Sequence, residues 1–439
     1  MTRRFDDAWQ EAVTVAREVT VHGYDVVLVR DLLGRVAVVV ADTDRRPYPE
    51  GLAARTTEQL NGRCAPFVAT SPLLMAKELF APESILSAPN LLVLNERDED
   101  TGRGRLSILE RGLVGAGWRT LVESPEPNRV TLYGFKGGVG RSTATAVLAR
   151  HLARLGRCVL AVDLDLESPG TSAVTLQEDD LPDHGIIDFL IESGVGNVDG
   201  LDCVSRSSSL LGRANGEVWV APAGGRPRAG YSYLPKLNRA YLDHAGTEQT
   251  FVGRLRAAVD YCSTEVERRS RRPDVVLLDS RSGMHDLAAA AITQLSDLTL
   301  LFGVDNAQTW SGYRELFGQW SIDPYLVRGI RERLRMVAAM VPASSEDEYL
   351  GGFRDRAQTL FAEYLYDEVA VGDVDAFNPP LTDTEAPHYP LPILFSSDLV
   401  GIDVTRDTDW LDQDFVSAAF GRFVSGATSL IIGNDGDEP

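Results

Sequence analysis

The stretch YGFKGGVGRST, residues 133–143, combines a glycine cluster with residues that bind phosphate and metal. It follows an apolar run typical of a strand and precedes a helical pattern, which is the setting of a phosphate-binding loop. Glycines allow backbone N–H groups to point at a polyphosphate, and the start of a helix adds partial positive charge. Ser142 is placed to offer its hydroxyl to Mg²⁺. The predicted nucleotide-binding residues are Lys136, Gly137, Gly138, Val139, Gly140, Arg141, Ser142 and Thr143.

This loop departs from the pattern Gly-x-x-x-x-Gly-Lys-Ser/Thr at two positions. Phe135 stands at the first glycine position and Arg141 at the lysine position. Arginine keeps the charge and can donate to two phosphate oxygens, although it is larger and more rigid than lysine. Only three of the 43 basic residues are lysines, so a change from lysine to arginine is weak evidence of lost function. We therefore expect Arg141 to contact phosphate and leave the hydrolysis rate open.

Aspartates end two further apolar runs that read as buried strands. CVLAVDLD ends with Asp163 and Asp165 on the same side, and DVVLLD ends with Asp279. In an open α/β sheet, ligands bind at the carboxyl ends of the strands. Asp163 and Asp279 are predicted to hold Mg²⁺ together with Ser142, while Asp165 can position water or support the metal's water shell. The alternatives are a solvated strand end or a helix cap.

Other polar residues are less specific. Asn306, at the end of another predicted strand, is either a nucleotide-base or switch contact or a loop cap. His285 lies near the Asp279 segment, where a helix-surface position is favoured over catalysis. The arginines of ERRSRR, residues 267–272, are expected to form a solvated helix end rather than a nucleic-acid contact. The four cysteines and six histidines show no disulfide or metal spacing.

The elements that position these residues begin at 129, where apolar strands alternate with helical patterns. This alternation predicts an α/β fold with a mostly parallel sheet and helices on both faces. Residues 1–122 are predicted to form a small α+β domain, 123–128 a linker, and 129–439 the phosphate-binding domain. In the small domain we expect a hairpin at YDVVLVRDLLGRVAVVV and helices near 5–18, 51–62 and 72–80. The last helix has an apolar stripe expected to face the core.

Composition limits the partners. The 439 residues carry a formal net charge of −21, which opposes non-specific binding to DNA or anionic lipid. The N-terminus lacks the pattern of a signal peptide, and no apolar run approaches the roughly 20 residues of a membrane span. With the scattered cysteines, these features predict a cytoplasmic location.

Together, the loop, the Asp-x-Asp strand and the Asp279 strand resemble those of the deviant Walker A ATPases, the ParA/MinD group of P-loop NTPases. "YGFKGGVGRST" and "LLDSRSG" resemble more narrowly a bacterial subgroup with a KGGVGR loop, often associated with conflict or signalling gene clusters. Lys136 matches the family's signature lysine, Arg141 its second lysine, and Asp279 its Walker B aspartate. The resemblance implies that Asp165 helps to orient the attacking water. It also implies an ATP-sandwich dimer, in which Lys136 of one subunit reaches the phosphates bound by the other.

The function implied is a Mg²⁺-dependent, ATP-binding switch that hydrolyses ATP slowly. Dimerisation would recruit or release a protein partner, with residues 1–122 as the partner-binding module. Three alternatives remain: a nucleotide-binding scaffold without useful turnover, a DNA-partition ATPase, which the charge disfavours, and a tyrosine autokinase. The last ranks low, because the final tyrosine is Tyr389 and the C-terminal tail has none.

Overall fold

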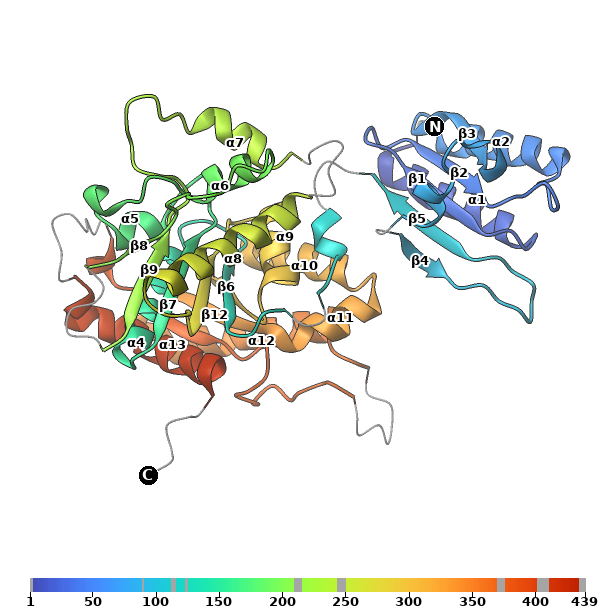
Figure 1. Cartoon of the computed structure of the whole chain (residues 1–439). Coiled ribbons are helices and arrows are strands. Elements are labelled where there is room, and N and C mark those ends of the chain that lie inside the picture. Colours follow the sequence, from blue (N-terminus) through green and yellow to red (C-terminus); the bar gives the residue numbers. More distant parts are fainter. Residues whose placement is uncertain are drawn as a thin grey trace. The chain divides into compact units, whose positions relative to one another are not determined.

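The computed structural model describes residues 3–88, 91–111, 116–122, 125–208, 215–242, 250–368, 376–400 and 410–433. The chain forms two compact units, Met1–Ala116 and Gly117–Pro439 (Figure 1). This division falls earlier than the predicted end of the small domain at residue 122. The reason is that Trp118 is buried in the second unit, with ring centroids 6.3 Å from Tyr133 and 6.2 Å from Trp320.

The first unit is a five-stranded mixed sheet with the strand order β3-β2-β1-β5-β4. Its main elements are α1 (Phe5–Thr20), β1 (Val26–Arg30), β2 (Val36–Val40), α2 (Glu50–Cys64), β3 (Val68–Met75), α3 (Glu83–Leu86), β4 (Leu92–Asn95) and β5 (Leu106–Glu110). The apolar faces of α1 and α2 pack with β1, β2 and β5 in one core. The unit therefore has its own hydrophobic core, as a domain requires.

Two expectations for this unit have different outcomes. The antiparallel hairpin of β1 and β2 is confirmed, with Val26 opposite Val40. The helix expected near 72–80 is wrong, because residues 68–75 form β3, followed by a short 3₁₀ turn. The segment pairs with β2 in parallel, and the hydrogen bonds of this pairing outweigh the weak helical pattern.

The second unit contains an eight-stranded sheet with the order β13-β12-β11-β6-β10-β7-β9-β8. Its strands are β6 (Arg129–Gly134), β7 (Cys158–Asp163), β8 (Ser205–Arg206), β9 (Glu217–Ala221), β10 (Val275–Asp279), β11 (Leu298–Gly303), β12 (Leu334–Val341) and β13 (Leu391–Leu394). Every pairing is parallel except that of β8 with β9. The predicted mostly parallel α/β sheet is confirmed.

Helices cover both faces of this sheet (Figure 1). The main ones are α4 (Arg141–Arg154), α5 (Thr171–Thr175), α6 (Ile186–Ser193), α7 (Leu234–Ala240), α8 (Phe251–Arg269), α9 (Asp286–Ala290), α10 (Ala307–Trp320), α11 (Pro324–Ile330), α12 (Glu346–Tyr364) and α13 (Asp414–Ile432). Helices α4 and α13 share one core with the sheet, and α6, α8, α10 and α12 belong to the cores of the other face. Covering both faces explains why the strands are continuous apolar runs.

Contrary to the expectation that no apolar run approaches a membrane span, helix α13 is long and apolar enough, by length and composition, to cross a membrane. Its apolar side instead packs on the sheet, where Phe423 and Phe302 lie 5.8 Å apart between ring centroids. Of the four residues of the expected core-facing stripe, Ala419 and Phe423 are buried, whereas Phe415 and Leu430 are partly buried.

Candidate functional site

The glycine-rich loop connects β6 to α4 and sets the direction of that helix. Gly140 is the N-cap of α4 with φ of 80°, and Gly138 has φ of 76°, values that other residues rarely adopt. Val139 points into the core and anchors the loop, whereas Lys136 is exposed. The loop thus presents backbone and Lys136 to solvent while its centre is fixed from below.

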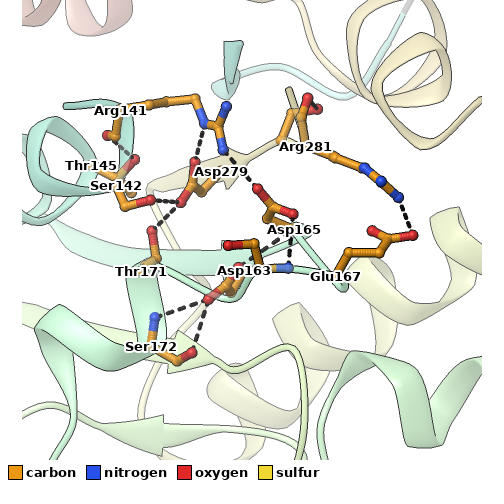
Figure 2. Close-up of polar contacts among 12 residues, drawn as sticks. Arg141, Ser142, Thr145, Asp163, Asp165, Glu167, Thr171, Ser172, Asp279 and Arg281 are labelled. Atoms are coloured by element: carbon orange, nitrogen blue, oxygen red, sulfur yellow. Dashed lines mark hydrogen bonds and ion pairs between the residues drawn. The ribbon is translucent and has the colours of Figure 1, made fainter. Parts of the chain in front are cut away.

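Asp279, at the end of β10, is the hub of the site (Figure 2). Its carboxylate is fully buried and accepts three side-chain hydrogen bonds. The hydroxyls of Ser142 and Thr171 each donate to Oδ2 at 2.6 Å, and Arg141 donates from Nε to Oδ1 at 2.6 Å. Loop, α5 and β10 therefore meet on one carboxylate.

Arg141 joins two carboxylates of the site. Besides its bond to Asp279, it donates from Nη2 to Asp165 Oδ2 at 3.1 Å. Its Nη1 is buried without a hydrogen-bond partner among the described residues. Burial alone would lower the pKa of Arg141, but the charges of Asp279 and Asp165 raise it overall. The expected phosphate contact of Arg141 stays a prediction, and the unused Nη1 is a donor available for it.

Asp163 lies beside Asp279 in the register of β7 and β10. Its Oδ2 accepts from the Ser172 amide at 3.0 Å and the Ser172 hydroxyl at 2.8 Å, and its Oδ1 accepts from the Asp165 amide at 3.2 Å. Burial and the neighbouring Asp279 carboxylate raise the pKa of Asp163 to about 7. Two adjacent carboxylates of this kind attract a divalent cation.

Thr171 and Ser172 were not predicted from the sequence. With Arg141, Ser142, Asp163, Asp165 and Asp279 they make up the first polar group of the site. They begin α5, immediately after the segment that follows Asp165. A Cβ placed on the preceding Gly170 would lie 2.4 Å from Ser142 Oγ, so only glycine lets the two segments approach. The sequence SPGTS, a turn with two hydroxyls after the Asp-x-Asp strand, is the signal that could have indicated them.

A second polar group lies at the same edge of the sheet (Figure 2). Arg281, two residues after Asp279, forms an ion pair with Glu167, two residues after Asp165. The Tyr241 hydroxyl donates to Glu167 Oε1 at 2.6 Å, and His285 Nε2 lies 3.9 Å from the same oxygen. His285 also caps α9, so the expected helix-surface position is a helix start instead. No role was predicted from the sequence for Glu167 or Tyr241.

Asn306 lies outside both groups. Its Oδ1 accepts a hydrogen bond of 2.9 Å from the Thr309 amide, which makes it the N-cap of α10. This is the loop-cap alternative of the sequence analysis. A nucleotide-base contact through the remaining amide nitrogen stays a prediction.

The residues of the first group fit a magnesium–nucleotide ligand. The hydroxyl of Ser142 and the carboxylates of Asp163 and Asp279 are oxygen ligands, which Mg²⁺ prefers. The glycine loop and the start of α4 offer backbone N–H groups, and the buried Arg141 Nη1 has a hydrogen to give. Bound Mg²⁺ would supply charge neutralisation at the phosphates.

Comparison with protein families identifies the fold around this site. Residues 130–352 match the CobQ/CobB/MinD/ParA nucleotide binding domain family. The chain belongs to this family. The match runs from β6 to the start of α12. It therefore contains the glycine-rich loop with Arg141 and the three aspartates of the site, Asp163, Asp165 and Asp279.

Individual relatives are more distant. Over 94 residues the chain is 37% identical to the chromosome-partitioning ATPase Soj of Thermus thermophilus. The aligned region is 21% of this chain and 37% of Soj. The chain thus spans little more than a third of that relative. Among solved structures, pNOB8 ParA bound to nonspecific DNA has a TM-score of 0.43 at 14% identity, covering 70% of this chain and 98% of that one. The MinD cell division protein of Aquifex aeolicus has 0.40 at 15% identity, covering 69% and 97%.

Proposed function

We propose that the protein is a Mg²⁺-dependent ATP-binding switch that hydrolyses ATP slowly and dimerises when ATP is bound. The observation that carries the proposal is the meeting of Arg141 and Ser142, from the glycine loop, on Asp279 at the end of β10. The family membership supports nucleotide binding by the same segment. A charged donor, a hydroxyl and a buried carboxylate are the groups that a magnesium–phosphate complex requires.

In this mechanism the chain's own residues divide the work. Arg141 and the loop amides bind phosphate oxygens, while Ser142, Asp163 and Asp279 hold Mg²⁺. Asp165 orients the attacking water. The exposed Lys136 reaches the phosphates held by the partner subunit and adds positive charge where negative charge develops during transfer.

The first unit is proposed as the partner-binding module. In its described residues, Asp42 is the one buried carboxylate; it accepts backbone N–H groups of Tyr48 and Lys77 and forms an ion pair with the Lys77 side chain. A domain with its own core and a structural use for its buried acid suits recognition better than catalysis. The cytoplasm is the proposed location, consistent with four free, buried cysteines.

DNA partitioning, the activity in Soj's name, is the less favoured function for this chain. The net charge of −21 opposes it. The arginines of residues 267–272 are also committed to acids, in ion pairs of Arg268 with Glu265, Arg269 with Asp202, Arg271 with Asp274 and Arg272 with Glu126. They form part of the protein's own surface network rather than a free basic patch.

Light scattering with a non-hydrolysable ATP analogue and Mg²⁺ tests the proposal. The parent protein should become a dimer, and Lys136→Ala should remain largely monomeric or lose phosphate release. Lys77→Ala is the matched control, because that lysine lies in the first unit and should behave as the parent. Absence of any nucleotide-dependent rise in the unfolding midpoint of the parent would refute ATP binding itself. Binding without phosphate release would favour the scaffold alternative.

A further inference from the structure

The pair of Arg281 and Glu167 has features of a temporary contact. Arg281 and Tyr241 both use Glu167 Oε1, while Glu167 Oε2 is buried without a hydrogen-bond partner among the described residues. An optimised arginine–carboxylate pair uses both oxygens. The two side chains are also 29% and 24% exposed, compared with 8% and 0% for Arg141 and Asp279. An ion pair that is partly exposed to water contributes little to the free energy of folding, so separating it costs little free energy.

Arg281 stands on the segment that runs along the phosphate loop. Tyr133, in the strand before the loop, donates its hydroxyl to the Gly283 carbonyl at 3.2 Å. A Cβ placed on Gly137 would lie 3.7 Å from Ser282 Oγ. Burial raises the pKa of Asp165, and the charges of Arg141 and Arg281 oppose that rise, which places Arg281 within electrostatic reach of the first group. The side chain thus extends from the border of the predicted nucleotide site toward Glu167 (Figure 2).

We propose that Arg281 is a further phosphate ligand. Its side chain pairs with Glu167 until a nucleoside triphosphate binds, and then contacts the terminal phosphate. The inference rests on the proposed ATP site. In P-loop proteins, contacts to the γ-phosphate order switch segments next to the bound nucleotide, and Arg281 follows the hub carboxylate Asp279 by two residues. The planar donors of a guanidinium match phosphate oxygens as well as carboxylate oxygens, so Arg281 can leave Glu167 for a phosphate. Glu167 keeps the Tyr241 hydroxyl when the arginine leaves.

The proposal predicts opposite effects of two substitutions. Arg281→Ala removes the ligand and should weaken binding of a non-hydrolysable ATP analogue about tenfold. Glu167→Gln keeps the shape but removes the charge that competes for Arg281, so it should strengthen analogue binding about threefold. ADP lacks the terminal phosphate, so its affinity should change less than about twofold in both variants. A structural clamp would instead make both variants bind both nucleotides more weakly.

Calorimetric titration of the full chain measures these affinities, and thermal unfolding without nucleotide reports whether each variant folds. Arg268→Ala is the control, since that exposed arginine pairs with Glu265 and should bind both nucleotides as the parent does. In the double variant, Glu167→Gln should add nothing once Arg281 is alanine. Equal analogue affinity of Arg281→Ala and the parent, or effects of the same sign in both variants, overturns the inference alone. A parent that binds neither nucleotide overturns the proposed function as well.

Discussion

Two buried carboxylates, one in each unit, differ in whether backbone amides hold them. Asp42 in the first unit accepts the backbone amides of Tyr48 and Lys77, at 3.4 and 3.3 Å, and forms an ion pair with the Lys77 side chain. Asp279 in the second unit accepts three side-chain donors and no backbone group among the described contacts. Backbone donors are fixed by the chain, whereas side chains can turn to a new ligand. The comparison distinguishes Asp42, a structural carboxylate, from Asp279, a carboxylate whose partners can exchange for a ligand.

Sheet topology explains how the second unit gathers such a site. In the second unit, β6, β7 and β10 are parallel neighbours, so the segments that follow them leave from the same edge. The first unit also has parallel neighbours, β1 with β5 and β2 with β3, but among its described residues Asp42 is the one buried acid. The parallel arrangement therefore brings Asp279, which is distant in sequence, next to Asp163 and Asp165 around one loop.

The largest expected effect is that of Asp279→Ala. Removing this carboxylate leaves the buried Arg141 with Asp165 as its remaining acid, and breaking a buried pair costs about 3–5 kcal/mol. We expect a loss near 3 kcal/mol in the unfolding free energy of the second unit, because Asp165 compensates in part. The MgATP-induced rise in the unfolding midpoint should disappear.

Asp42→Ala is the matched variant for this comparison. It should lower the stability of the first unit and leave the MgATP-induced rise intact. Urea unfolding with and without MgATP measures both quantities. If Asp42→Ala also abolished the MgATP-induced rise, or Asp279→Ala retained it, the distinction between a structural Asp42 and a ligand-binding Asp279 would be wrong.

The sequence predicted the carboxylates of the site better than the contacts among them. Motif spacing placed Asp163, Asp165 and Asp279 at strand ends, and the structure brings them together. It did not indicate that Arg141 lies on two of them, because ion pairing depends on side-chain conformations across 138 residues of separation. Thr171 and Ser172 were missed for the same reason, since their role comes from the close approach permitted by Gly170.

Local pattern failed where tertiary pairing decides. The segment 68–75 has a weak helical pattern but adds a strand beside β2. β5 was not anticipated, although it pairs with β1 inside the sheet, because its five residues follow a long charged loop. In the second unit the long apolar strands alternate with helices, so pattern and packing agree, and only the two-residue β8 was not predicted among the described strands.

Arg141→Ala is expected to have the next largest effect. Hydrogen bonds of charged groups to phosphate contribute about 1.5–3 kcal/mol each, so MgATP affinity should fall about tenfold to a hundredfold. Arg141→Lys should retain much of the affinity, since it keeps a charge near Asp279 and Asp165, and it should change turnover because a point charge replaces a planar group. Titration of the three proteins with MgATP measures this order. Equal binding by Arg141→Ala and the parent would mean that Arg141 serves the carboxylates alone.

The smallest expected effect comes from removing the first unit. A chain beginning at Gly117 keeps Trp118 against Tyr133 and Trp320, and keeps the bond from the Val122 amide to the Thr293 carbonyl at 3.1 Å. It should bind MgATP within about twofold of the full chain, because the residues of the predicted nucleotide site all lie in the second unit.

A chain beginning at Arg129 is the sharper companion, because it lacks Trp118, whose side chain is 7% exposed. Loss of a buried tryptophan costs about 3–5 kcal/mol, so this chain should unfold at a lower temperature than the one beginning at Gly117. Thermal unfolding and MgATP titration of both chains decide the matter. Equal stability would place the functional boundary at the linker predicted from sequence. A folded chain from Gly117 that fails to bind MgATP would show that the first unit contributes to the nucleotide site, and would end the division between recognition and catalysis.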